Sequence, residues 1–137
     1  MGGAGFTEPT RACGLRPGIA GQPQLEKAMT QYLFIESKDP LEDRGAVSYL
    51  ETALELRRLD QPVIVYFVEN GSHAARGGAE VSSRDALHAA GASLKVDAFA
   101  LRERGISSDR LAPGVEPGDV DDIVELLANP ETKAVWH

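Results

Sequence analysis

The sequence is poor in cysteine, in aromatic residues and in long hydrophobic runs. Cys13 is the single cysteine among 137 residues, so no disulfide can form within the chain, and a zinc site built from several cysteines is excluded. No apolar run approaches the roughly 20 residues that a membrane-spanning helix needs. The first residues also lack the apolar stretch of a secretory signal. These absences predict a cytoplasmic location.

Basic residues are in the minority, with 14 lysines and arginines against 21 acids and a net charge of −7. Nucleic acids and anionic membrane surfaces both select basic protein surfaces, so neither is an expected partner. The apolar fraction of 42% and the charged fraction of 26% are ordinary for a globular protein. At this length we expect one domain with its own hydrophobic core.

Residues 1–28 differ in composition from the rest of the chain. They are rich in glycine and proline and show no sustained hydrophobic period, so we predict a disordered leader. The leader is either a native extension or tag-derived sequence ahead of a native start at Met29, and we favour the second interpretation. The domain itself is expected to cover residues 29–137.

From Met29 onward, short apolar runs alternate with amphipathic segments. QPVIVYFVEN (61–70) is the most continuous apolar run, as expected for a central strand that is covered on both faces. The alternation predicts an α/β fold in which a mostly parallel sheet carries helices on both faces. The expected strands are 31–37, 61–70, 92–97 and 131–136; the expected helices are 39–60, 83–91, 98–104 and 119–129.

Two longer segments, 69–81 and 106–118, are expected to be loops because glycine and proline interrupt them. Ser82 or Ser83 is the expected cap at the start of the helix that follows the first loop, and Gly91 suits its end.

Motifs of the common nucleotide-binding and hydrolase sites are missing. Residues 37–40 read Ser-Lys-Asp-Pro where a dinucleotide-binding fold would have GxGxxG, and neither a Walker lysine motif nor GxSxG occurs. His73, His88 and His137 lack the spacing of metal ligands, so we expect them in loops or at the surface. We therefore expect no metal site and no cofactor.

The remaining candidates for chemistry lie at the carboxyl edge of the expected sheet, where open α/β sheets bind ligands. The loop from Asn70 to Gly78 follows the central strand, and its glycines let backbone amides approach a small anion; a plain flexible connection is the alternative. Asp97 ends the next strand and is expected to cap the helix after it by accepting from the amide of Phe99 or Ala100. A cysteine in the same place would be a reactive thiolate, whereas an aspartate supplies only the charge.

Residues 30–137 resemble the DsrE-like family of intracellular sulfur-transfer proteins, which includes the subunits of the Dsr and Tus sulfur relays. The resemblance rests on the order and spacing of four segments. These are YLFIES followed by Asp-Pro, VIVYFVENG, the L-x-x-x-G helix end from Leu87 to Gly91, and VDAFALRERGI (96–106).

In family members that carry sulfur, the last segment resembles Val-Cys, a short helix and then Arg-Gly. Val96, Arg104 and Gly105 match this frame, and Asp97 falls where the persulfide-forming cysteine would be. The resemblance implies a three-layer fold with a five-stranded parallel sheet. It also implies trimers or hexamers of like or related subunits and, for active members, a persulfide that is handed on to sulfur-carrier proteins.

Because Asp97 replaces the persulfide cysteine, we expect a non-catalytic or divergent subunit of a homo- or hetero-oligomer associated with sulfur trafficking, rather than an enzyme. The alternative is a small-ligand-binding protein or enzyme on the same scaffold, with Asp97 as base or acceptor; the adjoining helix start stabilises the carboxylate anion and so weakens it as a base. A third hypothesis, sulfur transfer by Cys13, is not favoured by the residues around that thiol. The candidate ligand- or partner-binding residues are Asn70, Gly71, Gly77, Gly78, Asp97, Arg102 and Arg104.

Overall fold

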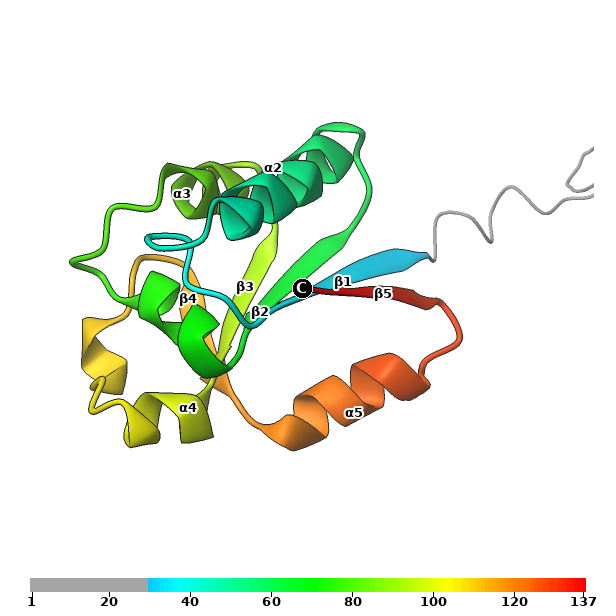
Figure 1. The fold of residues 1–137 in the computed structure, drawn as a ribbon. Coiled ribbons are helices and arrows are strands. Elements are labelled where there is room, and N and C mark those ends of the chain that lie inside the picture. The colour runs from blue at the N-terminus through cyan, green and yellow to red at the C-terminus, as the bar shows by residue number, and fades with distance from the viewer. Residues whose placement is uncertain (1–29) are drawn as a thin grey trace, which may run out of the picture. The chain divides into compact units, whose positions relative to one another are not determined.

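The computed structural model describes residues 30–137, which form the predicted parallel α/β fold (Figure 1). Five parallel strands lie in the order β4-β3-β2-β1-β5, so the most apolar strand, β2, is the central one. The predictions made for residues 1–28, Cys13 included, concern residues outside the described range. The elements are β1 (Gln31–Glu36), α2 (Arg44–Arg58), β2 (Val63–Phe67), η1 (Glu69–Ala75), α3 (Ser82–Ala89), β3 (Ser93–Asp97), α4 (Ala98–Glu103), η2 (Ser108–Arg110), β4 (Val115–Gly118), α5 (Val120–Ala128) and β5 (Thr132–Trp136).

Helices cover both faces of the sheet, with α2 and α3 on one face and α5 on the other (Figure 1). Because successive side chains of a strand point to opposite faces of the sheet, the core is divided into two clusters. Phe34 and Val65 face α2 and α3, whereas Leu33, Ile35 and Tyr66 face α5, and all five are buried. The core on the α2 side draws buried side chains from both helices and from four strands, whereas the α5 side has four buried hydrophobic residues. The α5 face is thus the less fully covered one.

Aspartates are the N-caps of three helices, α2, α4 and α5, and two of these caps make several hydrogen bonds. Asp43 accepts hydrogen bonds from the backbone amides of Gly45 and Ala46 at 2.7 and 3.4 Å at the start of α2. At the start of α5, Asp119 and Asp122 form a capping box, in which each side chain bonds the other residue's amide. Each such cap contributes about 1 kcal/mol to stability.

None of the described helices is long and apolar enough to cross a membrane.

Three local predictions were wrong. The N-cap of α3 is Val81, which makes no side-chain hydrogen bond, and not Ser82 or Ser83. The first predicted loop contains the 3-10 helix η1, most of which is buried.

The second predicted loop contains the edge strand β4. Its sequence, Val-Glu-Pro-Gly, has little strand propensity, and the strand forms because it pairs with β3 from Leu94↔Val115 to Asp97↔Gly118. A proline is tolerated there because β4 has a neighbour on one side only.

Candidate functional site

A pocket of about 720 Å³ opens between η1, the end of α4 and η2. Arg76, Arg104 and Arg110 line it together with His73, and among residues 30–137 Asp109 is the only carboxylate in the lining. We call this the arginine pocket. It lies beyond the carboxyl ends of β2 and β3, the edge at which open parallel sheets bind ligands. It gathers positive charge on a chain whose net charge is −7.

One buried arginine fixes the loop that carries Arg76. Arg84, with only 3% of its surface exposed, donates hydrogen bonds to the carbonyls of Ala74, Arg76 and Ala79 at 2.7, 3.1 and 3.0 Å. Its charge is balanced by the exposed carboxylate of Asp85 at 2.9 Å. The irregular backbone between η1 and α3 therefore has a side chain at its centre that satisfies its carbonyl groups.

Backbone hydrogen bonds join this loop to the segment that carries Arg110. The amide of Gly77 donates to the carbonyl of Arg110 at 2.7 Å, and the amide of Ala112 donates to the carbonyl of Ala75 at 2.8 Å. The two sides of the arginine pocket are thus held by main chain as well as by side chains.

The structure brings several of the predicted site residues together. Arg104 donates from Nη2 to Oδ1 of Asn70 at 3.0 Å, and Gly78 lines the arginine pocket beside Arg104. Gly77 adjoins the same wall through its backbone. Gly71 has a packing role, because a Cβ atom there would lie 2.1 Å from the carbonyl oxygen of Glu36.

Of the seven predicted residues only Gly78 and Arg104 line the arginine pocket, and Asp97 and Arg102 lie apart from it. Asp97 accepts from the amide of Phe99 at 3.2 Å and is the N-cap of α4, as predicted. The guanidinium of Arg102 lies 5.8 Å from the centre of the Phe99 ring. Burial, followed by the charges of Asp122, Asp97 and Asp119, raises the pKa of Tyr66, so Asp97 belongs to an acidic corner on the α5 side.

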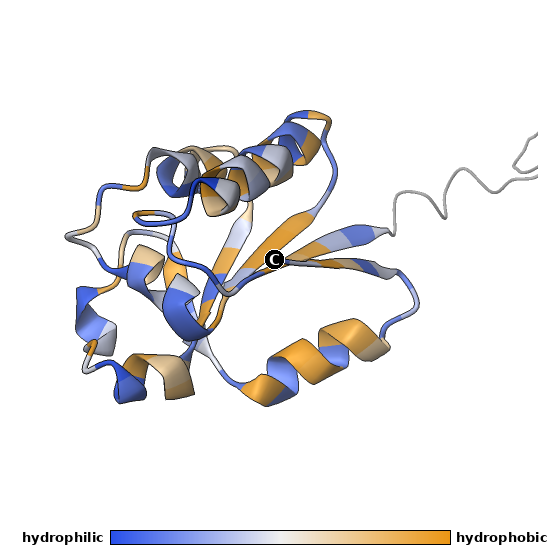
Figure 2. Ribbon diagram, viewed as in Figure 1, coloured by the Kyte–Doolittle hydropathy of each residue, from blue (hydrophilic) through white to orange (hydrophobic). Residues whose placement is uncertain are grey.

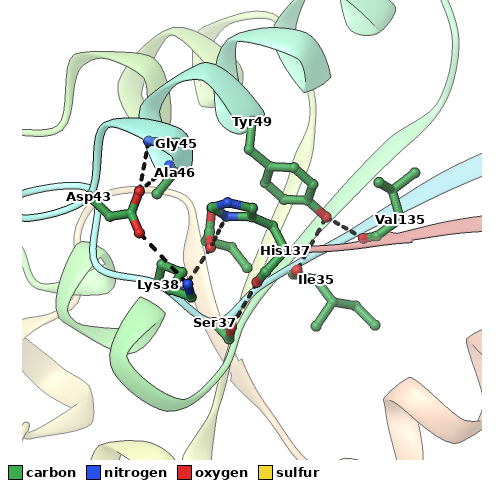
Figure 3. A network of polar contacts seen from close by, with 10 residues as sticks. Ile35, Ser37, Lys38, Asp43, Gly45, Ala46, Tyr49, Val135 and His137 are labelled. Atoms are coloured by element: carbon green, nitrogen blue, oxygen red, sulfur yellow. Dashed lines mark hydrogen bonds and ion pairs between the residues drawn. The ribbon is translucent and has the colours of Figure 1, made fainter.

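A third polar group joins β1, α2 and the end of β5 (Figure 3). The fully buried Glu36 lies 3.0 Å from Nδ1 of His137 and accepts from the amide of Lys38 at 2.8 Å. Tyr49 stacks on the His137 ring at 5.1 Å and donates its hydroxyl to the carbonyls of Ile35 and Val135. Burial raises the pKa of Glu36, and the hydrogen bonds from Lys38 and His137 lower it in part.

Sequence analysis missed most of the arginine pocket. Arg76 stands directly before Gly77 and Gly78 in the loop after the central strand, which is a signal that the sequence offers. Arg110 carries no such signal, because only the folded chain brings η2 next to that loop. The pairing of Glu36 with His137 joins residues 101 positions apart and was not predicted either.

These features define a parallel α/β protein with a polar site at the carboxyl edge of its sheet. No protein-family model matches the sequence, and no curated protein matches it. Several solved structures are similar, and in two of them the matched region covers 79% of this chain and 99% of the other chain. These two are the YchN protein from E. coli, with a TM-score of 0.72 and 16% identity, and MTH1491, a protein of unknown function from Methanobacterium thermoautotrophicum, with a TM-score of 0.67 and 18% identity.

Both neighbours have a DsrE-like fold, and the fold of this chain is DsrE-like as well. The five-stranded parallel sheet between helices agrees with the architecture that the sequence resemblance implied. At such low identity the likeness establishes the fold alone.

Proposed function

We propose that this protein is a DsrE-like subunit associated with intracellular sulfur trafficking that does not itself carry a persulfide. It works in a trimer or hexamer of like or related subunits, with sulfur-carrier proteins as further partners. The observation that carries the proposal is the corner after β3. There the sequence resemblance places the persulfide cysteine of the family, and this chain has Asp97.

The Asp97 carboxylate occupies this corner as a helix cap. Its Oδ1 atom accepts from the amide of Phe99 at 3.2 Å, the amide that would stabilise a thiolate at the same place. A carboxylate cannot form the sulfur–sulfur bond of a persulfide, and residues 30–137 contain no cysteine. The corner therefore keeps its negative charge and lacks its sulfur chemistry.

The apolar residues of α5, orange in Figure 2, support the assembly because several of them are exposed. Ile123 and Leu126 of α5 pack against the sheet, yet Val120, Val124 and Leu127 form a second stripe that is 63, 56 and 48% exposed. A helix with apolar residues on two sides is typical of an element that is covered by another subunit. The nearby edge strand β5 adds Trp136, which is 65% exposed and pairs with Ile35 of this face.

The proposal is tested by incubating the full chain with polysulfide and recording the intact mass. We expect wild type to behave as Cys13→Ser does, with no added sulfur. In the Cys13→Ser background, Asp97→Cys is expected to gain the mass of sulfur, because the amide of Phe99 stabilises a thiolate there. Ser48→Cys, which places a thiol on the exposed side of α2, is the control and should react more slowly.

Two outcomes would contradict the proposal. Sulfur uptake by wild type but not by Cys13→Ser would identify Cys13 as the carrier. Equal rates for Asp97→Cys and Ser48→Cys would show that the corner after β3 has no special affinity for sulfane sulfur.

A further inference from the structure

We propose that the arginine pocket binds a small dianionic oxyanion of the phosphate or sulfate type. The inference rests on the charges and contacts of the pocket and does not depend on a role in sulfur trafficking.

The positive charge of the arginine pocket is unbalanced. Arg76 and Arg110 form no ion pair with any residue of the range 30–137, and the acid nearest to Arg104 is the exposed Glu103 at 3.9 Å. The one carboxylate in the lining, Asp109, accepts a hydrogen bond from the hydroxyl of Ser107. Like charges held close together repel, and a bound dianion converts that repulsion into attraction.

Two of the arginine donors are already held in place. Arg76 donates from Nε to the carbonyl of His73 at 2.9 Å, which leaves its two terminal nitrogens for a ligand. Arg104 is held by Asn70 at 3.0 Å. A guanidinium group is a planar fork that binds two oxygens of one oxyanion, and groups fixed in advance lose less entropy when the ligand binds.

The chemistry of the lining favours a compact anion. No phenylalanine, tyrosine or tryptophan of the described residues lines the pocket, and Ile106 is its only large aliphatic side chain. A nucleobase would find only the imidazole of His73 to stack on, and an acyl chain would find no apolar wall beyond Ile106. Charge and hydrogen bonding are what the pocket offers, and a tetrahedral dianion uses both.

The test is an NMR titration of the full-length ¹⁵N-labelled chain with inorganic phosphate and, separately, with sulfate. Ionic strength is held constant with sodium chloride, because electrostatic binding weakens as salt rises. We expect saturable shifts of the amides of Gly78 and Gly105, which line the pocket, and none at Gly45, which begins α2. A higher affinity for phosphate or for sulfate shows which of the two anions the pocket selects. Equal affinities mean that the pocket recognises charge and tetrahedral shape. Either result supports the proposal.

Two variants with the same change in net charge make the test specific. Arg110→Gln removes an exposed lining arginine and is expected to weaken binding about tenfold or more, the loss of one charge-assisted contact. Arg102→Gln removes an arginine that lies over Phe99 and does not line the pocket, and should leave the affinity unchanged. The proposal is overturned if wild type shows no saturable shift beyond the chloride control, or if both variants lose affinity equally.

Discussion

Glu36 is a carboxylic acid without exposed surface, at the end of the strand next to the centre of the sheet. Burial raises its pKa above the usual glutamate range, so the folded protein holds this proton to higher pH than the unfolded chain does. The stabilising contribution of the bound proton is therefore complete below the ordinary glutamate pKa. It is lost as the pH rises through the raised pKa of the folded state.

Replacing this carboxyl group should remove that pH dependence. We expect the free energy of unfolding of wild type to fall, relative to Glu36→Gln, as the pH rises from about 4 to about 8. Chemical denaturation across this range measures the difference. Glu42→Gln, at an exposed position before α2, is the control and should follow wild type at every pH. If the difference in free energy of unfolding between wild type and Glu36→Gln stays constant with pH, Glu36 has the same pKa in the folded and the unfolded chain, and the prediction is wrong.

At the scale of elements, the connection between η1 and α3 depends on Arg84 more than on any regular structure. Its guanidinium is the shared donor for three carbonyl groups, that of Ala74 at the end of η1 and those of Arg76 and Ala79 in the irregular backbone that follows. Removing the guanidinium takes a donor from each of these carbonyl groups, of which that of Arg76 still accepts from the amide of Ala79, and leaves a cavity in a buried place. The position of Arg76 at the arginine pocket follows from this arrangement.

Arg84→Leu is expected to lower the free energy of unfolding by about 3 kcal/mol, the usual cost of breaking a buried charged network. Amide hydrogen exchange should accelerate most between residues 74 and 79. The matched control is Arg58→Leu, which removes an ion pair with Glu55 at 3.0 Å that is more than half exposed. Its expected cost is at most about 1 kcal/mol, because solvent screens exposed pairs. Equal costs would show that the contacts of Arg84 do not fix the loop.

At the scale of the whole molecule, the sheet is covered unequally. Two helices and a large core lie on one face, whereas α5 alone packs over a small cluster on the other face and leaves a second apolar stripe outward. Another subunit that packs on this stripe of α5 would bury it. In a closed ring of subunits, the stripe of every subunit would be covered.

Light scattering during size-exclusion chromatography tests this expectation. Wild type should elute as a trimer or hexamer, and Val124→Lys should dissociate it because a lysine would be buried without a partner. Leu59→Lys changes a residue that is 69% exposed at the end of α2, away from α5, and should leave the assembly intact. Circular dichroism confirms that both variants are folded. A monomeric wild type would contradict the proposed assembly.

The sequence by itself determined the features that depend on neighbours along the chain. Apolar runs located β1, β2 and β3, and the spacing of apolar residues located the helices. Gly91 and Gly105 end α3 and α4 with positive φ angles of 92° and 65°, and Asp97 caps α4. In each case the physical cause is the conformational preference or short-range hydrogen bond of the residue itself.

Only the tertiary structure decided what depends on residues far apart. The strand β4 exists through its pairing with β3, since its own sequence favours a loop. The arginine pocket joins charges from η1, α4 and η2, and Glu36 meets His137 across 101 positions. Hydrophobic periodicity indicates which side of an element faces the core, but it does not indicate which polar side chains meet where the strands end. That meeting is set by the order of the strands and by the packing of the loops, and both arise only when the chain is folded.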